Sequence, residues 1–214
     1  MRVGVIDYGV GNLGSVLRAL EELRVVPILV TRPIDMHATD SLILPGVGNF
    51  SDCARLLGEG GWTDALWDEV QERGKPLLGV CVGMQLLAYS SMEGADIDAP
   101  DGTPGLGFIP GRVDHLRRLG CSLRVPHVGW NDVTISSKKC VLFDGIPDGT
   151  DFYFVHSYAF VPEDPANVLA TTDYGVLVTA AVRRGHIWGT QFHPEKSSRA
   201  GFRLLRNFIE APRC

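Results

Sequence analysis

Short apolar runs alternate with helix-like segments in the first part of the chain, and this alternation constrains its fold more than any other feature. The apolar runs cover residues 2–7, 26–30, 41–44 and 77–80. Residues 12–23 and about 51–73 instead repeat their apolar side chains at helical spacing, with Asn12 suited to the first N-cap. Strands that alternate with helices form parallel sheets covered on both faces. The sequence therefore predicts an α/β fold with a central, mostly parallel sheet flanked by helices.

The second half has a different pattern, in which strand-like runs are joined by tight turns. The runs cover residues 125–135, 152–161, 168–172, 177–183 and 186–192, with Arg184-Gly185 as a hairpin signal. A closing helix over 198–210 is expected to bury Phe202, Leu205, Phe208 and Ile209. Residues 93–105, rich in Gly, Pro and Asp, are expected to form an exposed loop. Since no repeat or linker divides the chain, residues 1–214 are expected to form a single domain with an additional antiparallel strand region in its C-terminal half.

Charge and composition argue against several classes of protein. The 214 residues carry a formal net charge of −5, whereas nucleic acids are bound by clustered Lys and Arg, so no nucleic-acid partner is expected. The longest apolar stretch, residues 76–89, is too short to span a membrane, and an acidic residue at position 7 argues against a signal peptide. The five cysteines, at positions 53, 81, 121, 140 and 214, include no C-x-x-C pair. We therefore expect a cytoplasmic protein without a disulfide framework, a metal site or another cofactor.

Cys81 lies between an apolar strand and a helix predicted over residues 83–89, with Gly79 and Gly83 two residues away on either side. A sharp strand-to-helix turn needs such small neighbours where backbones approach closely. A thiol at a helix N-terminus also has its pKa lowered by the helix dipole, and the thiolate is the reactive form. A single cysteine is more often a buried packing residue. The flanking glycines favour a nucleophile at Cys81, and the other four cysteines lack them.

A nucleophilic cysteine needs an imidazole to take its proton and a third group to orient that imidazole. Of the six histidines, His193 ends an apolar strand and is followed by Pro194 and Glu195. Residues i and i+2 of an extended segment project to the same side, so Glu195 is expected to reach the His193 ring. The alternative is that Glu195 only pairs with Lys196 at the surface, an interaction of little energetic weight.

With these residues in view, the chain resembles the class I, or triad, glutamine amidotransferases. The segment G-V-C-V-G-M-Q at 79–85 and F-H-P-E at 192–195 have the order and spacing of that family. The resemblance implies an α/β amidotransferase fold in which Cys81 attacks the side-chain amide of L-glutamine. His193 acts as base and then acid, Glu195 orients it, and a γ-glutamyl thioester forms before water releases glutamate.

The resemblance also assigns roles to other positions. Gly46, Val47 and Gly48 correspond to an oxyanion strand, in which the Val47 N–H joins the Val82 N–H once a peptide has rotated. Gln85, one helical turn after Cys81, and the backbone around His156, Ser157 and Tyr158 correspond to contacts with the substrate glutamine.

Further segments narrow the resemblance to members of the family that form a heterodimer with a (β/α)8-barrel cyclase subunit of histidine biosynthesis. These segments are D-Y-G-V-G-N-L at 7–13, P-G-V-G at 45–48, P-H-V-G-W-N at 126–131, Y-F-V-H-S-Y at 153–158 and H-P-E-K-S at 193–197. In such a complex the ammonia passes to the cyclase. Asn12, Trp130, Tyr153 and Lys196 correspond to interface positions, although Trp130 alone could equally be a core residue.

Two other functions compete with this one. Gly9, Gly11 and Gly14 form a G-x-G-x-x-G pattern between a strand and a helix, as in dinucleotide-binding proteins. That motif needs an acidic residue about 20 positions further on, where this chain has Thr31-Arg32-Pro33, and Asp7 would repel a pyrophosphate. The second competitor keeps the triad in a γ-glutamyl hydrolase or in the glutaminase of another amidotransferase. A non-catalytic scaffold on the same fold would leave Cys81, His193 and Glu195 unexplained.

Overall fold

A computed structural model describes residues 1–95, 101–136 and 140–211. The helices are α1 (Leu13–Glu22), α2 (Phe50–Glu59), α3 (Trp62–Trp67), α4 (Val82–Gln85) and α5 (Ser198–Glu210). The strands are β1 (Val3–Ile6), β2 (Pro27–Val30), β3 (Ser41–Gly46), β4 (Leu77–Cys81), β5 (Ser90–Ser91), β6 (Thr103–Pro104), β7 (Gly111–His115), β8 (His127–Ile135), β9 (Thr150–His156), β10 (Tyr158–Pro162), β11 (Val168–Asp173), β12 (Leu177–Arg184) and β13 (Ile187–Thr190). No helix in these three ranges is long and apolar enough to cross a membrane.

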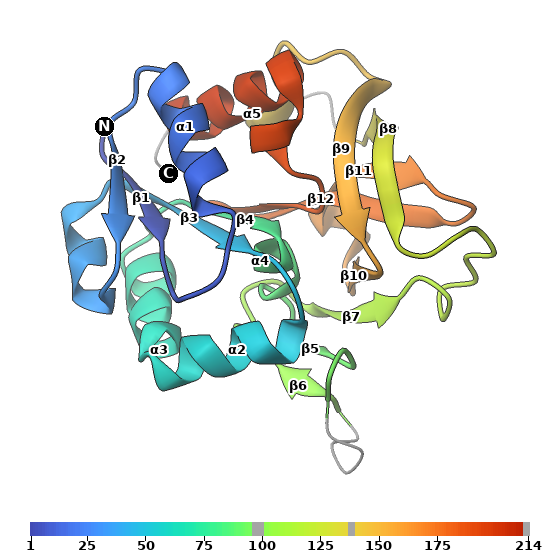
Figure 1. The fold of residues 1–214 in the computed structure, drawn as a ribbon, viewed down its shortest axis with the longest axis horizontal. Helices are drawn as coiled ribbons and strands as arrows, with labels where there is room; N and C mark the ends of the chain where they lie inside the picture. Colours follow the sequence, from blue (N-terminus) through green and yellow to red (C-terminus); the bar gives the residue numbers. More distant parts are fainter. Residues whose placement is uncertain (96–100, 137–139, 212–214) are drawn as a thin grey trace.

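The main sheet joins the two halves of the chain. Within the described residues it has nine strands in the order β2-β1-β3-β4-β13-β12-β11-β8-β9. The strands from β2 to β13 pair in parallel, and those from β13 to β9 pair antiparallel. Helices α1 and α5 cover one face of the parallel part, whereas α2 and α3 lie on the other side (Figure 1). The predicted α/β fold with an antiparallel C-terminal region is therefore confirmed.

The strand burial explains why the parallel part forms in the centre. Strands β1, β3 and β4 are buried at every position, as expected when helices cover both faces of a sheet. One continuous hydrophobic core contains side chains from β1 through α5, including Val5, Leu44, Phe154 and Phe208. The core thus spans both the parallel and the antiparallel regions.

Several element boundaries differ from the sequence-based expectations. The helical region 51–73 is broken, because Gly61 adopts a φ of +69° between α2 and α3, and a π-helical turn follows at Asp68–Glu72. The helix expected over 83–89 is only α4, since the carbonyls of residues 86–89 accept hydrogen bonds from residues 105–109 instead of continuing the helix. Asn12 occupies the N-cap of α1, but its side chain makes no capping hydrogen bond there.

The second half shows two further differences. The strand expected over 152–161 is two strands, because β9 joins the main sheet and β10 pairs with β7 in a smaller sheet. The expected loop 93–105 contains β6, which pairs with β5, while residues 96–100 lie outside the described part. The β12–β13 hairpin at Arg184-Gly185 is confirmed, and so is α5, although Phe202 is only partly buried.

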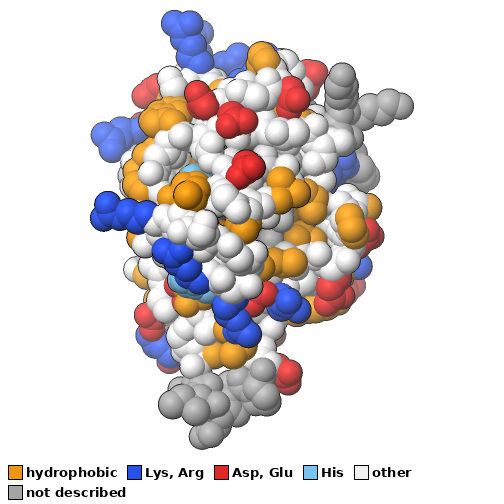
Figure 2. Space-filling view, turned by 90° about the vertical axis from the view of Figure 1, so that its right-hand side faces the viewer, with side chains coloured by type: hydrophobic (Ala, Val, Ile, Leu, Met, Phe, Trp, Pro, Cys, Tyr) orange, Lys and Arg blue, Asp and Glu red, His pale blue; other side chains and the backbone are white. Residues whose placement is uncertain are grey.

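The antiparallel ribbon formed by β8 and β9 has two chemically different faces. On its inner face His127 pairs with His156 across the strands. On its outer face Val128 pairs with Val155, and Trp130 pairs with Tyr153. We call these four outer side chains the ribbon face. Figure 2 views the molecule from the side where β8 and β9 lie, and hydrophobic side chains reach the surface there in patches.

Candidate active site

Three adjacent strands place the main candidate residues at one edge of the sheet. β3, β4 and β13 are neighbours and run parallel, so their carboxyl ends meet. Val47 follows β3, Cys81 ends β4, and His193 comes shortly after β13. The carboxyl ends of parallel strands are the usual location of ligand sites in α/β proteins.

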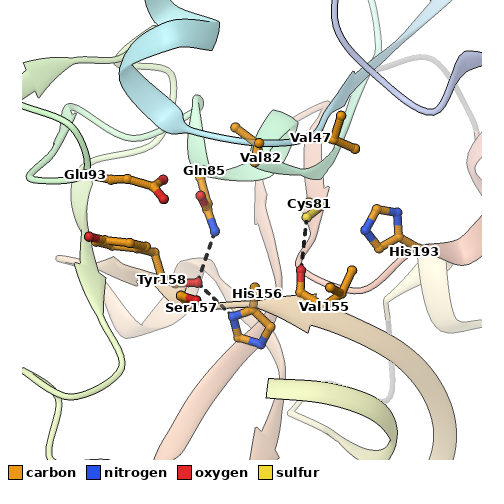
Figure 3. Close-up of a pocket in the computed structure, with 11 residues that line it drawn as sticks. Val47, Cys81, Val82, Gln85, Glu93, Val155, His156, Ser157, Tyr158 and His193 are labelled. Atoms are coloured by element: carbon orange, nitrogen blue, oxygen red, sulfur yellow. Dashed lines mark hydrogen bonds between the residues drawn. The ribbon is translucent and has the colours of Figure 1, made fainter. Parts of the chain in front are cut away.

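Cys81 adopts the strained turn that its glycine neighbours predicted. Its φ of 57° and ψ of −113° are uncommon for a residue with a side chain, and such strain is typical of functional sites. A Cβ on Gly83 would lie 1.9 Å from the Leu44 carbonyl oxygen, and one on Gly79 would lie 2.5 Å from the Gly83 oxygen. Only glycines allow the backbones to approach so closely, and the turn directs the thiol toward the pocket between β4 and β9 (Figure 3).

His193 and Glu195 meet as expected, although by a different backbone path. The distance from His193 Nδ1 to Glu195 Oε1 is 2.9 Å, and the two side chains are 3% and 1% exposed. The segment is not extended at that point, because Pro194–Lys196 forms a 3₁₀ turn that brings the carboxylate back to the ring. Burial and this contact distinguish Glu195 from a surface carboxylate that pairs only with Lys196.

The contact with Glu195 fixes the tautomer of His193. A carboxylate accepts hydrogen bonds, so Nδ1 carries the ring proton and Nε2 of the neutral ring holds a lone pair. Nε2 is buried and has no hydrogen-bond partner among the described residues. Burial lowers the pKa of His193, but the neighbouring Cys81 and Glu195 outweigh burial and raise that pKa to about 9. The ring is therefore suited to accept a proton from Cys81 and hold it.

Ser197 holds the backbone of His193 in place. Its hydroxyl donates to the His193 carbonyl oxygen at 2.6 Å and accepts from the Tyr153 N–H at 3.0 Å. The His193 N–H in turn donates to the Tyr153 carbonyl oxygen at 3.0 Å. These bonds join the loop after β13 to β9, a long-range pairing that the sequence pattern did not indicate.

Most of the predicted site residues line one pocket. These are Val47, Gly48, Cys81, Val82, Gln85, His156, Ser157, Tyr158 and His193 (Figure 3). Gly46 and Glu195 do not line the pocket but contact residues that do, namely Cys81 and His193. Gly46 pairs with Cys81 in the β3–β4 ladder, and a Cβ there would lie 2.6 Å from the Gly83 nitrogen.

The backbone of the P-G-V-G segment is partly fixed by its neighbours. The Cys53 thiol donates to the Val47 carbonyl oxygen at 3.5 Å, which directs that oxygen toward α2. Gly48 has a φ of +91°, a conformation that side chains disfavour. Val82 is the first residue of α4, where backbone N–H groups lack helical acceptors.

Gln85 contacts the opposite wall of the pocket with its amide nitrogen. Gln85 Nε2 donates one hydrogen bond to the Tyr158 carbonyl oxygen and a second to Gln191 Oε1, and both distances are 3.0 Å. Gln85 can therefore offer a ligand only its Oε1, an acceptor. Gln191, which directly follows β13, was not among the predicted residues, because no local motif marks it.

Glu93 is the second pocket residue that the sequence did not identify. Its carboxylate lines the pocket and accepts the Phe50 N–H at 3.0 Å, at the start of α2. Burial raises the pKa of this carboxyl, and the hydrogen bond from Phe50 partly offsets that effect. Its position in a Gly- and Asp-rich segment suggested an exposed loop, and only the fold brings it to the pocket.

Three of the four candidate interface residues lie together at the ribbon face. The Trp130 and Tyr153 rings are 6.1 Å apart edge to face, and Lys196 Nζ lies 5.9 Å from the Tyr153 ring centroid. Trp130 is 54% exposed, which excludes a core role. Asn12 lies at the start of α1, which packs against the 3₁₀ turn that contains Lys196.

The glycine-rich loop after β1 has a structural explanation. Asp7 Oδ1 accepts the Gly9 N–H at 3.1 Å, and a Cβ on Gly11 would lie 3.3 Å from the Pro45 ring. In the described ranges, no group of three or more His, Cys, Asp or Glu side chains is arranged to hold a metal ion.

Residues 4–211 match the sequence profile of the family described as glutamine amidotransferase class-I. The chain belongs to the class-I glutamine amidotransferase family. This membership favours the amidotransferase prediction over the dinucleotide-binding alternative.

Similar proteins support the same membership. The chain is 47% identical over 212 residues to imidazole glycerol phosphate synthase subunit HisH of Moorella thermoacetica, covering 99% of this chain and 95% of the relative. The subunit of the same name from Rhodospirillum rubrum is 44% identical over 216 residues, covering 98% of each chain. A crystal structure of a glutamine amidotransferase superposes with a TM-score of 0.73 at 25% identity, covering 97% of both chains. The structure of PurLQS from Thermotoga maritima has a TM-score of 0.70 at 19% identity, covering 97% of both chains, and so shares the fold.

Proposed function

We propose that this chain is the glutaminase subunit of an imidazole glycerol phosphate synthase, with Cys81, His193 and Glu195 as its catalytic triad. The observation that carries the proposal is the free Nε2 of a buried, Glu195-oriented His193 at the pocket that also contains the Cys81 thiol. Full-length similarity to subunits of that synthase supports the choice of reaction.

The triad geometry suits a two-step hydrolysis. Cys81 Sγ attacks the γ-carboxamide carbon of L-glutamine while His193 Nε2 takes the thiol proton, and the same nitrogen then gives it to the departing ammonia. The product is a γ-glutamyl thioester on Cys81. Water then attacks the thioester carbon, His193 takes a proton from that water, and L-glutamate leaves as the thiol reforms.

The pocket walls suit the remaining parts of glutamine. The Val82 N–H at the start of α4, together with the Val47 N–H after a peptide rotation in 46–48, would stabilise the oxyanion of each tetrahedral intermediate. The Glu93 carboxylate would pair with the α-ammonium group, and Gln85 Oε1 would accept a hydrogen bond from it. The backbone of 156–158 closes the pocket on the other side.

The ribbon face suits a partner that receives the ammonia. Val128 and Trp130 are each 54% exposed, and Val155 is 37% exposed, although all three are apolar. Exposed apolar patches of this kind mark protein interfaces. Val155 also lines the pocket, and its carbonyl oxygen accepts from the Cys81 thiol at 3.9 Å, so the ribbon face adjoins the reaction centre.

This arrangement supports a heterodimer with a (β/α)8-barrel cyclase subunit, which would use the ammonia to make imidazole glycerol phosphate and aminoimidazole carboxamide ribotide in histidine biosynthesis. We place the complex in the cytoplasm and assign residues 1–214 to one domain. The four cysteines in the described ranges are free, and one core spans both halves of the chain.

The test is glutamate release from L-glutamine by the complex of this chain with its cyclase. Cys81→Ser should reduce this activity by at least about 10⁴-fold, because the alcohol is a far weaker nucleophile in a site built for a thiolate. The variant should still bind the cyclase. Retained glutamine hydrolysis in Cys81→Ser would contradict the proposal, whereas full activity of the isolated chain would favour a stand-alone γ-glutamyl hydrolase.

A further inference from the structure

The inner face of the β8–β9 ribbon carries a histidine pair that the proposed chemistry does not use. His127 and His156 are cross-strand partners and are 2% and 6% exposed. Burial lowers the pKa of His127 to about 4 and that of His156 to about 3. Both rings are therefore neutral at neutral pH, and each must exist as one of two tautomers.

The hydrogen bonds allow only one tautomer for each ring. The Tyr158 carbonyl oxygen can only accept, so His156 Nδ1, at 2.8 Å, carries a proton and its Nε2 is an acceptor. His127 Nδ1 lies 3.0 Å from that Nε2 and must donate to it. His127 Nε2 is then an acceptor, which faces the Asn131 amide nitrogen at 3.5 Å. Every donor along this path points toward Tyr158.

The same carbonyl oxygen belongs to the glutamine pocket. It accepts a second hydrogen bond from Gln85 Nε2, so Gln85 and His156 meet at one atom (Figure 3). Gln85 Nε2 donates its other hydrogen bond to Gln191 Oε1. The amide nitrogen of Gln191 in turn lies 3.8 Å from Cys81 Sγ. A continuous chain of buried and part-buried hydrogen bonds thus runs from His127 through the pocket wall to the thiol.

We propose that His127 is a positioning residue, whose Nδ1–H holds His156 and, through the Tyr158 carbonyl, the 156–158 wall and Gln85 in the geometry that receives glutamine. This role deepens the proposed function and rests on it. Without the His127 donor, His156 Nε2 is a buried acceptor with no partner, a costly state that favours a different ring orientation. The Tyr158 carbonyl and Gln85 would then lose their fixed positions.

The surroundings of His127 allow its packing and its hydrogen bond to be separated. Its ring is stacked between Phe154, at a centroid distance of 4.8 Å, and Tyr174, at 3.9 Å. His127→Phe keeps an aromatic ring in this stack but removes the donor. His127→Asn removes the ring but places an amide N–H where Nδ1 stood. A purely structural role would be better served by Phe, and a positioning role by Asn.

The experiment compares two alkylating probes on the full-length chain. A chloroketone analogue of glutamine must bind in the pocket before it alkylates Cys81, whereas iodoacetamide needs only a reactive thiol. We expect His127→Phe to slow the chloroketone reaction about tenfold, because one buried hydrogen bond is lost. The slower reaction should result mainly from weaker binding of the chloroketone before alkylation. The iodoacetamide rate should stay close to that of the wild type. His127→Asn should keep most of the chloroketone rate even if its melting temperature is lower.

Two results would overturn this inference alone. One is a His127→Phe variant that reacts with the chloroketone at the wild-type rate. The other is that the chloroketone rates of the two variants have the same order as their melting temperatures, with His127→Asn slower than His127→Phe. A wild-type chain that shows no saturable labelling by the chloroketone would instead contradict the proposed function itself.

Discussion

At the scale of single residues, the clearest effect of the fold is the raised pKa of His193. The ring is buried, yet its pKa is raised to about 9 because Cys81 and Glu195 lie beside it. Most buried histidines shift in the opposite direction, as His127 and His156 do. The fold thus favours a charged ring at His193 once it has taken the Cys81 proton, and neutral rings at His127 and His156.

The raised pKa of His193 predicts a pH-dependent contribution to stability. The folded state binds the proton more tightly than the unfolded state, whose histidine has a pKa of about 6.5. The stabilisation is therefore complete below about pH 6.5 and is lost as the pH rises through about 9. Glu195→Gln should reduce this stabilisation. The difference in unfolding free energy between wild type and variant should therefore shrink as the pH rises from about 6.5 to about 9. Urea unfolding at several pH values measures it, and a difference that is constant with pH would contradict the raised pKa.

The sequence predicted some site residues and missed others for identifiable reasons. Cys81 and His193 follow strands and carry local signals, namely paired glycines and the Pro194-Glu195 that follows. Glu93 lies in a segment whose composition is that of a loop, and Gln191 lies in the strand-like run 186–192 without a motif of its own. Their roles depend on long-range contacts, such as the Glu93 bond to α2, that no local pattern specifies.

At the scale of elements, the β4–α4 turn is the most constrained part of the chain. Gly83 lies so close to β3 that an added Cβ would meet the Leu44 carbonyl oxygen, a backbone atom that cannot move cheaply. Gly83→Ala should therefore lower the free energy of unfolding by about 3 kcal/mol and displace Cys81. The matched control is Gly58→Ala in α2, where an added Cβ meets nothing within 4 Å.

The control should be neutral or stabilising by up to about 1 kcal/mol, because alanine favours a helix. Chemical denaturation of both variants measures the difference. Equal stabilities for Gly83→Ala and Gly58→Ala would show that the turn is not tightly packed.

The predicted bounds of helices and strands were wrong where distant segments of the chain bond to the same backbone groups. Local periodicity gave β1, β4 and α5 nearly to the residue, since their burial follows from their own side chains. Residues 83–89 have a helical pattern, but their later carbonyls bond to residues 105–109. Likewise β9 and β10 form one continuous apolar pattern, and only pairing with β8 and β7 assigns them to different sheets.

At the scale of the whole molecule, the ribbon face defines how the chain would deliver ammonia. Trp130→Ala removes an exposed side chain, so the melting temperature should change little, while the affinity for the cyclase should fall at least about tenfold. Val26→Ala is the control, since Val26 is 80% exposed beside β2, at the opposite edge of the sheet. Equal affinities for the two variants would remove the ribbon face from the interface.

The P-G-V-G segment predicts that activity depends on the partner. The Val47 carbonyl oxygen is held by Cys53, and the Val47 N–H is proposed to complete the oxyanion hole only after a peptide rotation. The isolated chain should therefore hydrolyse glutamine far more slowly than the complex with the cyclase and its ligand. Steady-state glutamate release measures this ratio, and a ratio near one would show that no switch is needed.

The central claim is that Cys81 carries the γ-glutamyl group, and acid-quench mass spectrometry tests it most directly. The complex is mixed with L-glutamine, quenched in acid within the first turnover, digested and analysed peptide by peptide. The account predicts the mass of one γ-glutamyl group on the peptide that contains Cys81, and none in Cys81→Ser. Glutamate production without that modification, or with the modification on another residue, would contradict it.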